Sequence, residues 1–437
     1  MFKRKMIFAA VVGALGAGAT GAYAQAPSGD DPALERGLSG NVELYGYLYP
    51  EFTMMSATSG TPAAVIPAGS TNLGNLSAAP VGLALQSRAS VDASNSRFGF
   101  RGKEDLGGGM TAIWQLESTV PIDQGAGTLA SRDSYVGLRG GFGTVRLGFM
   151  ETVYKTIGDP MKFMNLGSGN FISASNILSA RQPFNIGGAA SSAGSFHLRQ
   201  PNSLLYNSPD IGGFQASALY SPDETKVGTR NANMQSYGVT YKTGGLYLAL
   251  AYEVHNDFFG GSSNLSFGGT GVANVSAAQL AAGTIGNNHS KDTSPRASVM
   301  YSWDKSRVSF DLTTIDFKES GQAAGRHFQD YKNTRYNVSW QQVWGSDARW
   351  RTMAQYTSAA SGTCTFSDGS VCDTTGLNGN MLALGGEYWF SKRTALFALY
   401  AKLNNGSTAS YNNTANAKTL SPGSDITQYA LGVRTTF

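Results

Sequence analysis

Polar and apolar residues alternate along much of the chain with a period of two, the pattern of a β-strand whose two faces meet different surroundings. The segment 333–344 shows it clearly. Asn333, Arg335, Asn337, Ser339 and Gln341 are polar, whereas Tyr336, Val338, Trp340 and Trp344 are apolar or aromatic. An aromatic face this broad would be a large exposed patch on a soluble protein. The pattern predicts strands with one face in water and one in an apolar medium.

The segment 429–437 repeats this pattern. Tyr429, Leu431, Val433 and Phe437 share one side of an extended strand, and Arg434 lies on the other with small residues. If the apolar side faces lipid, the strand belongs to a closed barrel, because an open sheet leaves unpaired edges in hydrocarbon. We expect this last strand to close the wall by pairing with the first strand near Val42 and Leu44.

Connections between the strands are short and long in alternation. The short turns are 104–109, 141–143, 209–213, 243–245, 304–306, 345–347 and 391–393. The long connections are 56–87, 123–131, 152–202, 223–233, 255–294, 319–331, 359–379 and 405–424. Seven short turns alternating with eight long connections require sixteen strands. This predicts an all-β fold, a transmembrane antiparallel barrel with short periplasmic turns and long extracellular loops.

Two strands do not follow the simple alternation. The strand around 87–103 needs a bulge to keep its phase. The strand from Thr394 to Leu403 is apolar on both faces, which the alternation does not explain.

Composition agrees with a barrel in lipid. Charged residues are 14% of the chain, against about 25% in an average soluble domain, and glycine is abundant at 55 residues. Downstream of the first 24 residues there is no run of eighteen apolar residues, so no transmembrane helix is predicted. Three of the 33 basic residues lie at positions 3–5, and the remaining 30 nearly balance 29 acidic residues. Nucleic acid is therefore not an expected partner.

Residues 1–24 read as a secretory signal peptide, with a basic start at Lys3–Lys5, a short apolar run and an Ala-Tyr-Ala end at 22–24. A retained membrane anchor is the alternative, but the run is too short and too rich in Gly and Ala to span well. The rest of the chain, 25–437, is expected to form one barrel domain.

The cysteines of the chain are Cys364 and Cys372, which lie in a polar stretch. In an exported protein they are expected to form one disulfide that closes a short loop. None of the four histidines is near them in sequence, so we predict neither a metal site nor a cofactor.

A barrel of sixteen strands encloses a water-filled lumen rather than a packed core. Something should narrow it, and the third long connection, about 152–202, is the longest. A loop of this length needs a role of its own. Its apolar residues, such as Phe171, Ile172 and Ile177, argue against full exposure. We therefore expect it to fold inward as a constriction, the alternative being that it projects outside.

Several segments resemble the general porins of Gram-negative bacteria, most of all the branch typical of beta-proteobacteria. They are Leu44–Gly46, Ser96–Gly109, Gln115–Glu117, Tyr135–Leu138, Gly141–Gly148, Asn202–Ser203, Tyr206, Ser208–Pro209, Gly212–Phe214, Ser391–Thr394 and Phe437. The resemblance implies a homotrimer in outer-membrane lipid and lipopolysaccharide that passes small hydrophilic solutes and ions by diffusion. It also implies that the barrel-assembly machinery recognises Phe437 as a signal. Thr435 departs from the family in this respect, because an aromatic residue is often found two positions before the last one.

The resemblance also implies arginines on the wall that faces the constriction loop. The matching positions are Arg97, Arg132 and Arg199, each of which could instead be a rim or trimer-contact arginine held by a carboxylate. Phe149 stands where the family usually has another arginine, and Arg146 is a partial substitute. Glu151 and Asp159 in the loop region are outnumbered by nearby cations. Fixed charge at a narrow point selects ions, so we expect a weak anion preference.

The sequence leaves three other functions to consider. An outer-membrane enzyme would need a nucleophile and a base within reach of each other, and neither the scattered histidines nor any G-x-S-x-G motif provides them. An adhesion barrel would act through its long loops. A substrate-specific channel would need a ladder of aromatic or charged side chains, for which Tyr45, Tyr47 and Tyr49 are candidates if they do not pack against the constriction loop.

Overall fold

A computed structural model describes residues 41–61, 85–93, 95–125, 127–162, 166, 169–179, 183, 194–224, 230–262, 287–322, 326–413 and 420–437. The predicted signal peptide, 1–24, lies outside these residues. The helices in the described part are the single turns α3 (Val153–Thr156) and α4 (Ser175–Leu178) and a 3-10 turn, Asp159–Met161. None of them is long and apolar enough to cross a membrane.

The described strands are β1 (Asn41–Leu48), β2 (Glu51–Ala57), β3 (Leu85–Asp92), β4 (Arg97–Gly107), β5 (Met110–Thr119), β6 (Ser134–Gly140), β7 (Gly143–Glu151), β8 (Arg199–Asn207), β9 (Phe214–Pro222), β10 (Asn233–Thr243), β11 (Leu246–Asn256), β12 (His289–Trp303), β13 (Ser306–Ser320), β14 (Phe328–Trp344), β15 (Trp350–Ala359), β16 (Thr363–Phe366), β17 (Gly379–Trp389), β18 (Thr394–Asn405) and β19 (Ile426–Thr436).

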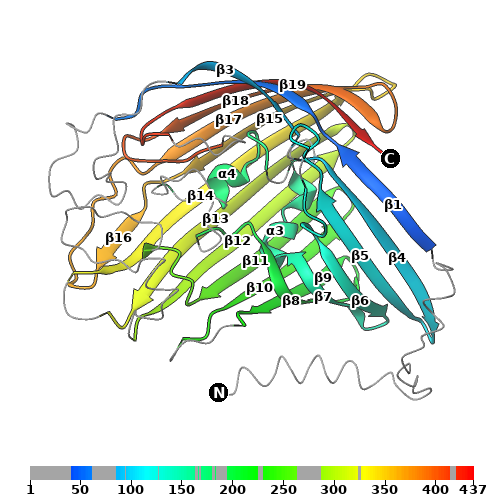
Figure 1. Cartoon of the computed structure of the whole chain (residues 1–437), viewed down its shortest axis with the longest axis horizontal. Coiled ribbons are helices and arrows are strands. Elements are labelled where there is room, and N and C mark those ends of the chain that lie inside the picture. The colour runs from blue at the N-terminus through cyan, green and yellow to red at the C-terminus, as the bar shows by residue number, and fades with distance from the viewer. Residues whose placement is uncertain are drawn as a thin grey trace.

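These 19 segments belong to one sheet and make sixteen wall strands. β1 and β2 are one wall strand interrupted at Tyr49–Pro50, where proline cannot donate to the ladder. β3 and β4 are another, interrupted between Asp92 and Arg97, where the sequence predicted a bulge. β16 extends the sheet beside β14 beyond the end of β15 and is not a separate wall strand. The predicted sixteen-stranded antiparallel barrel is confirmed (Figure 1).

The last strand closes the ring, but not where it was predicted to. β19 pairs with β2 from Ile426 opposite Ala57 to Gly432 opposite Glu51, and then with β1 at Tyr47 and Leu48. The prediction that it pairs near Val42 and Leu44 was wrong. Alternation of side chains sets which face points inward, whereas register at the seam depends on the stagger of the whole ring.

The alternation of seven short turns and eight long connections agrees with the described strands. Two long connections are shorter than predicted, because β11 to β14 extend further and leave 257–288 and 321–327 between them. The third connection ends at 198 rather than 202, because β8 already begins at Arg199. Arg199 is therefore a wall residue.

The outer face carries the apolar side chains of the alternating pattern. Exposed large apolar residues on it include Val338, Trp340, Trp344, Tyr429, Leu431 and Val433. On the other face of the last strand, Arg434 is 2% exposed and forms an ion pair with Glu387, with 2.5 Å between Nη2 and Oε1. The two faces therefore have the surroundings that the sequence predicted, one apolar medium and one polar interior.

The terminal Phe437 lies against a glycine of the first strand. Its backbone N–H donates to the carbonyl of Gly46 at 3.2 Å, and the Gly46 N–H donates to the carbonyl of Phe437 at 3.0 Å. A Cβ atom at position 46 would clash with the Phe437 ring. Glycine at this position therefore leaves room for the tip of the Phe437 ring at the seam.

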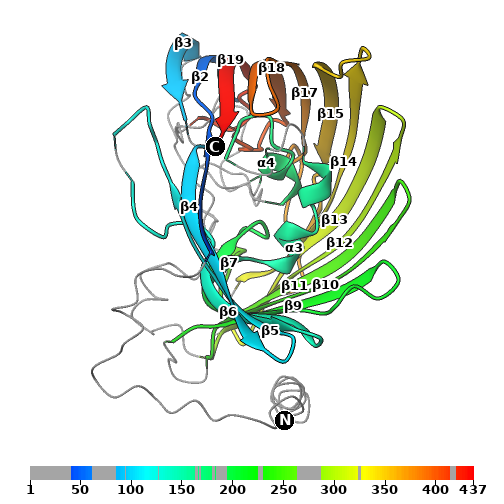
Figure 2. The same ribbon diagram turned by 90° about the vertical axis from the view of Figure 1, so that its right-hand side faces the viewer.

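The described residues of the third connection fold into the barrel, and Figure 2 shows α3 and α4 within the ring of strands. Wall side chains donate hydrogen bonds to its backbone carbonyls at several points: Tyr247 to Ile157 at 2.6 Å, Arg296 to Tyr154 at 2.8 Å, Gln355 to Ile172 at 2.8 Å, Arg307 to Pro160 at 2.9 Å and Arg335 to Ile177 at 2.9 Å. These bonds satisfy carbonyls that have no ladder partner.

The same connection explains why β18 is apolar on both faces. Leu396 points outward and is 37% exposed, whereas Phe397 and Leu403 point inward and are buried. Phe397 clusters with Phe171 and Ile172 of the third connection, and Leu403 with its Ile177. The inner face of β18 is therefore a surface that the third connection covers, not a lumen wall.

We expect Phe397→Ala to destabilise the barrel by about 3–5 kcal/mol, because Tyr49 stacks on that ring at 4.3 Å and a cavity would remain. The matched control Leu396→Ala should cost less, because lipid chains can fill the space on the outer face. Urea unfolding of the refolded barrel, followed by tryptophan fluorescence, measures both. Equal losses would contradict the assignment of the two faces.

Candidate pore constriction

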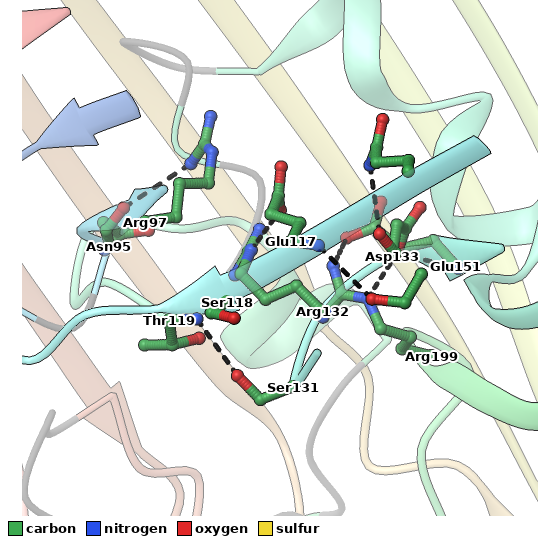
Figure 3. A network of polar contacts seen from close by, with 12 residues as sticks. Asn95, Arg97, Glu117, Ser118, Thr119, Ser131, Arg132, Asp133, Glu151 and Arg199 are labelled. Atoms are coloured by element: carbon green, nitrogen blue, oxygen red, sulfur yellow. Dashed lines mark hydrogen bonds and ion pairs between the residues drawn. The ribbon is translucent and has the colours of Figure 1, made fainter. Parts of the chain in front are cut away.

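A polar cavity of about 190 Å³ separates the wall of β4 to β8 from the third connection. Residues of the wall and of the second connection line one side, and Lys155 and Lys162 of the third connection line the other. The lining residues are Asn95, Arg97, Gln115, Glu117, Arg132, Asp133, Glu151, Lys155, Lys162 and Arg199. Figure 3 shows most of them, with their ion pairs and hydrogen bonds.

Arg132 is held at the cavity by the wall strand β5. Its backbone N–H donates to the carbonyl of Glu117 at 2.9 Å, and its guanidinium forms an ion pair with the Glu117 carboxylate. The other carboxylate oxygen accepts a hydrogen bond from the Tyr45 hydroxyl at 3.0 Å. Arg132 therefore lines the interior cavity and is at the same time held by a carboxylate, so it combines the two alternatives that the sequence left open.

Arg199 joins two carboxylates across the start of the third connection. Its guanidinium binds Asp133 and lies 2.5 Å from an oxygen of Glu151. The same Glu151 oxygen lies 2.9 Å from Nζ of Lys155 in α3. The Thr152 side chain caps α3 by accepting a hydrogen bond from the Lys155 N–H. This network fixes the angle at which the third connection leaves the wall.

Arg97 differs from the other two arginines. Its guanidinium lies 4.7 Å from the centre of the Tyr47 ring, and its Nη1 donates a long hydrogen bond of 3.5 Å to the carbonyl of Asn95. Among the described residues, no carboxylate lies within ion-pair distance of it. Cation–π contact orients the guanidinium without cancelling its charge.

Cations outnumber carboxylates in the cavity. Five basic side chains line it, from Arg97, Arg132, Lys155, Lys162 and Arg199, against three carboxylates, from Glu117, Asp133 and Glu151. Asp159 pairs with Lys162 at 2.6 Å and adds a fourth negative charge beside it. The local excess is one positive charge. Since carboxylates neutralise most of the cations, the cavity has a weak positive field rather than a strong one.

Two carboxylates outside the strands, those of Asp133 and Asp159, have raised pKa values. Burial, followed by the neighbouring Glu151 carboxylate, raises the pKa of Asp133 although Arg199 opposes the shift. Burial also raises the pKa of Asp159, against the effect of Lys162. Both groups therefore begin to take up protons at a higher pH than an ordinary aspartate.

Of the predicted residues, the structure brings together Arg97, Arg132, Arg199 and Glu151, with Asp159 beside them. Arg146 is not part of the cavity. It points inward five residues from Glu151, roughly 17 Å along β7, where it binds Asn207 at 2.5 Å and lies over Tyr135. Arg146 thus does not replace the arginine that the family has at Phe149. Phe149 itself lies beneath Arg199, with its ring centre 5.9 Å from the guanidinium.

Sequence reasoning missed Glu117 and Asp133. Glu117 lies in a motif that was noted only for its resemblance, and Asp133 directly follows Arg132. The useful signal was the inward phase of Glu117 on β5, because an inward carboxylate opposite inward arginines has to pair with one of them.

The disulfide between Cys364 and Cys372 is present and closes the hairpin of the seventh connection, with 5.2 Å between the Cα atoms. In the part of the chain that the structure describes, no cluster of three His, Cys, Asp or Glu side chains could hold a metal ion.

The family model of Gram-negative porins matches residues 9–408. The chain belongs to this family. Membership confirms the predicted family and the location in the outer membrane of a Gram-negative bacterium.

Individual relatives of this porin match over shorter stretches. The major outer membrane protein P.IB of Neisseria lactamica is 31% identical over 160 residues, which are 36% of this chain and 41% of that protein. The corresponding protein of Neisseria gonorrhoeae is 31% identical over 163 residues, 36% of this chain and 40% of that protein. The chain thus spans about two fifths of the length of these curated relatives.

Solved structures show the same fold at lower identity. The anion-selective porin from Comamonas acidovorans has a TM-score of 0.61 at 21% identity and covers 91% of this porin and 100% of its own chain. The outer-membrane expressed OmpT of Vibrio cholerae has a TM-score of 0.57 at 11% identity, with 91% and 98% covered.

Because Asp133 and Asp159 protonate early while the arginines keep their charge, we expect any anion preference of this porin to increase as pH falls from 7.5 to 4.5. Reversal potentials in a planar bilayer under a KCl gradient at the two pH values measure this change. The variant Asp133→Asn should already be more anion-preferring at pH 7.5 and should change less with pH. A shift toward cations at low pH would contradict the charge assignment.

Proposed function

We propose that this porin forms a water-filled channel through which small hydrophilic solutes and ions diffuse passively across the outer membrane. The observation that carries the proposal is the charged cavity between the β4–β8 wall and the third connection, inside a closed barrel. Apolar contacts hold the third connection against β15, β17 and β18, so the passage is confined to the opposite, charged side.

The passage is weakly anion-preferring, with the third connection (about 152–198) and the side chains around it as the constriction. Arg97 contributes most to this preference, because Arg132 and Arg199 are paired with carboxylates, whereas the described contacts of Arg97 are with the Tyr47 ring and the Asn95 carbonyl, neither of which is charged. Glu151 and Asp159 reduce the preference by pairing with Lys155 and Lys162.

The proposal includes the partners that the family resemblance implies. The porin assembles as a homotrimer in lipid and lipopolysaccharide after removal of residues 1–24, and the barrel-assembly machinery recognises the strand that ends at Phe437. The exposed outer position of Phe437 on the seam supports such recognition. We propose no catalytic activity.

A general diffusion channel is favoured over a substrate-specific one, because two of the three tyrosines that could have formed an aromatic ladder are buried. Tyr47 and Tyr49 are 7% and 1% exposed and cluster with Leu166, Phe171 and Ile172 of the third connection. They support the constriction loop from behind and do not offer ring faces to a passing solute.

A liposome-swelling assay with sugars, amino acids and organic acids of increasing size tests this proposal. We expect a smooth decline of swelling rate with solute size, because no described ladder of rings favours one solute. A single solute far above the curve would show a substrate-specific channel instead. Absence of swelling with every solute would contradict a diffusion channel.

Replacing Arg97 by glutamine should shift the reversal potential in a KCl gradient toward cations, because the change removes a cation that no carboxylate neutralises. The matched control is Lys332→Gln, which removes the same charge from the outer face of β14 and should leave the reversal potential unchanged. If Arg97→Gln behaves like the control, Arg97 does not set selectivity.

A further inference from the structure

Two cavities that share a lining residue lie on the short-turn side of the barrel, away from the constriction. The first, about 330 Å³, is lined by residues of β13, β14, β15, β17 and β19 and by the short turn before β13. The second, about 440 Å³, adjoins the short turns around Asp347 and Ser391. Arg351 of β15 lines both. Any solute that leaves the constriction on this side passes them.

The first cavity has an excess of positive charge. Lys305, Arg307, Arg351 and Arg434 line it, against the carboxylates of Asp304 and Glu387. Glu387 is already engaged, because Arg434 lies 2.5 Å from one of its oxygens and the indole N–H of Trp389 donates to the other at 3.1 Å. Its charge therefore acts mainly on Arg434, with a smaller electrostatic effect on Arg351.

Arg351 packs its guanidinium against an aromatic ring. Its guanidinium lies 4.8 Å from the ring of Trp389, and Arg434 lies 4.6 Å from the same ring, so two guanidinium groups contact one indole. The Nε atom of Arg351 is buried without a hydrogen-bond partner, and no described carboxylate lies within ion-pair distance. A guanidinium that is oriented by a ring and has no ion pair suits a carboxylate or phosphate, which its planar fork can bind with two parallel bonds.

The first cavity is linked to the constriction through Lys162. Arg307 donates to the carbonyl of Lys162 at 3.3 Å and to that of Pro160 at 2.9 Å. The ammonium of Lys162 belongs to the constriction cavity. Residues 160–162 of the third connection therefore lie between two groups of cations. The Lys162 side chain belongs to the constriction cavity, and the carbonyls of Pro160 and Lys162 accept hydrogen bonds from Arg307 of the first cavity.

We propose that Arg351, with Arg307 beside it, forms a second anion-binding station on the periplasmic side of the channel, and that its ligands are small oxyanions, namely carboxylates and phosphate. This inference rests on the proposed channel function and extends it. Oxyanions that pass the constriction dwell at this station before they reach the periplasm, whereas chloride, which cannot form two parallel bonds, passes with less delay.

Block of chloride current by inorganic phosphate tests the station. In a planar bilayer with channels of one orientation, phosphate added on the periplasmic side should reduce wild-type current. Arg351→Gln should raise the half-blocking concentration about five-fold, the order expected when one charge-assisted contact is lost at a partly exposed site. Arg351→Lys should fall between the two, because it keeps the charge but loses the planar fork. Phosphate should block the Lys332→Gln channel at the same half-blocking concentration as the wild type.

The outcomes separate the station from the channel itself. A heat-modifiable folded band on a gel first shows that each variant is assembled. The proposed station is contradicted if the wild type conducts KCl but is not blocked by phosphate. It is also contradicted if phosphate blocks Arg351→Gln as strongly as the wild type. In both cases the proposed channel function is unaffected. If Arg351→Gln fails to assemble, Arg351→Lys decides. If the wild type does not conduct, the proposed function fails and the station with it.

Discussion

The fold of this porin depends on one constraint: a backbone that crosses lipid has no water to satisfy its N–H and C=O groups, so every strand edge has to be paired. The pairing of β19 with β2 and β1 meets this requirement by closing the ring. Closure of sixteen wall strands then encloses a lumen too wide for the inner side chains to fill. The third connection and the charged cavity follow from that width.

The third connection divides the lumen into two unlike halves. Wall donors bind its carbonyls, and its apolar side chains cover the inner faces of β15, β17 and β18. On the other side, Arg199, Asp133, Glu151 and Lys155 fix its point of departure and leave cations facing the β4–β8 wall. The apolar side of the third connection thus contributes to the stability of the barrel, and its charged side contributes to ion selectivity.

Much of the fold could be predicted from the sequence, because strand phase is a local property. The alternation in 333–344 and the rhythm of the connections led to the correct strand count. The seam register could not be predicted, since it depends on the stagger of all the strands. The apolar inner face of β18 was also unexplained, because the residues that cover it lie more than 200 positions away in sequence, at Phe171 and Ile177.

The candidate site was predicted less completely. Arg97, Arg132 and Arg199, which were chosen from the family resemblance, line one cavity, whereas Arg146 lies outside it, because a match to a motif does not give the height of a side chain along the barrel. The carboxylate partners depend on how two connections fold back on the wall. The inward phase of Glu117 was a signal for its pairing with an arginine, whereas the pairing of Arg199 with Asp133 could be recognised only in three dimensions.

The reversal potential of the wild-type porin in a ten-to-one KCl gradient tests the central claim most directly, because it requires an open lumen and reports the sign of its charge at once. An excess of one positive charge in the cavity predicts a conducting channel whose reversal potential is displaced modestly toward that of chloride. A channel that prefers potassium, or a membrane that stays closed, would contradict it.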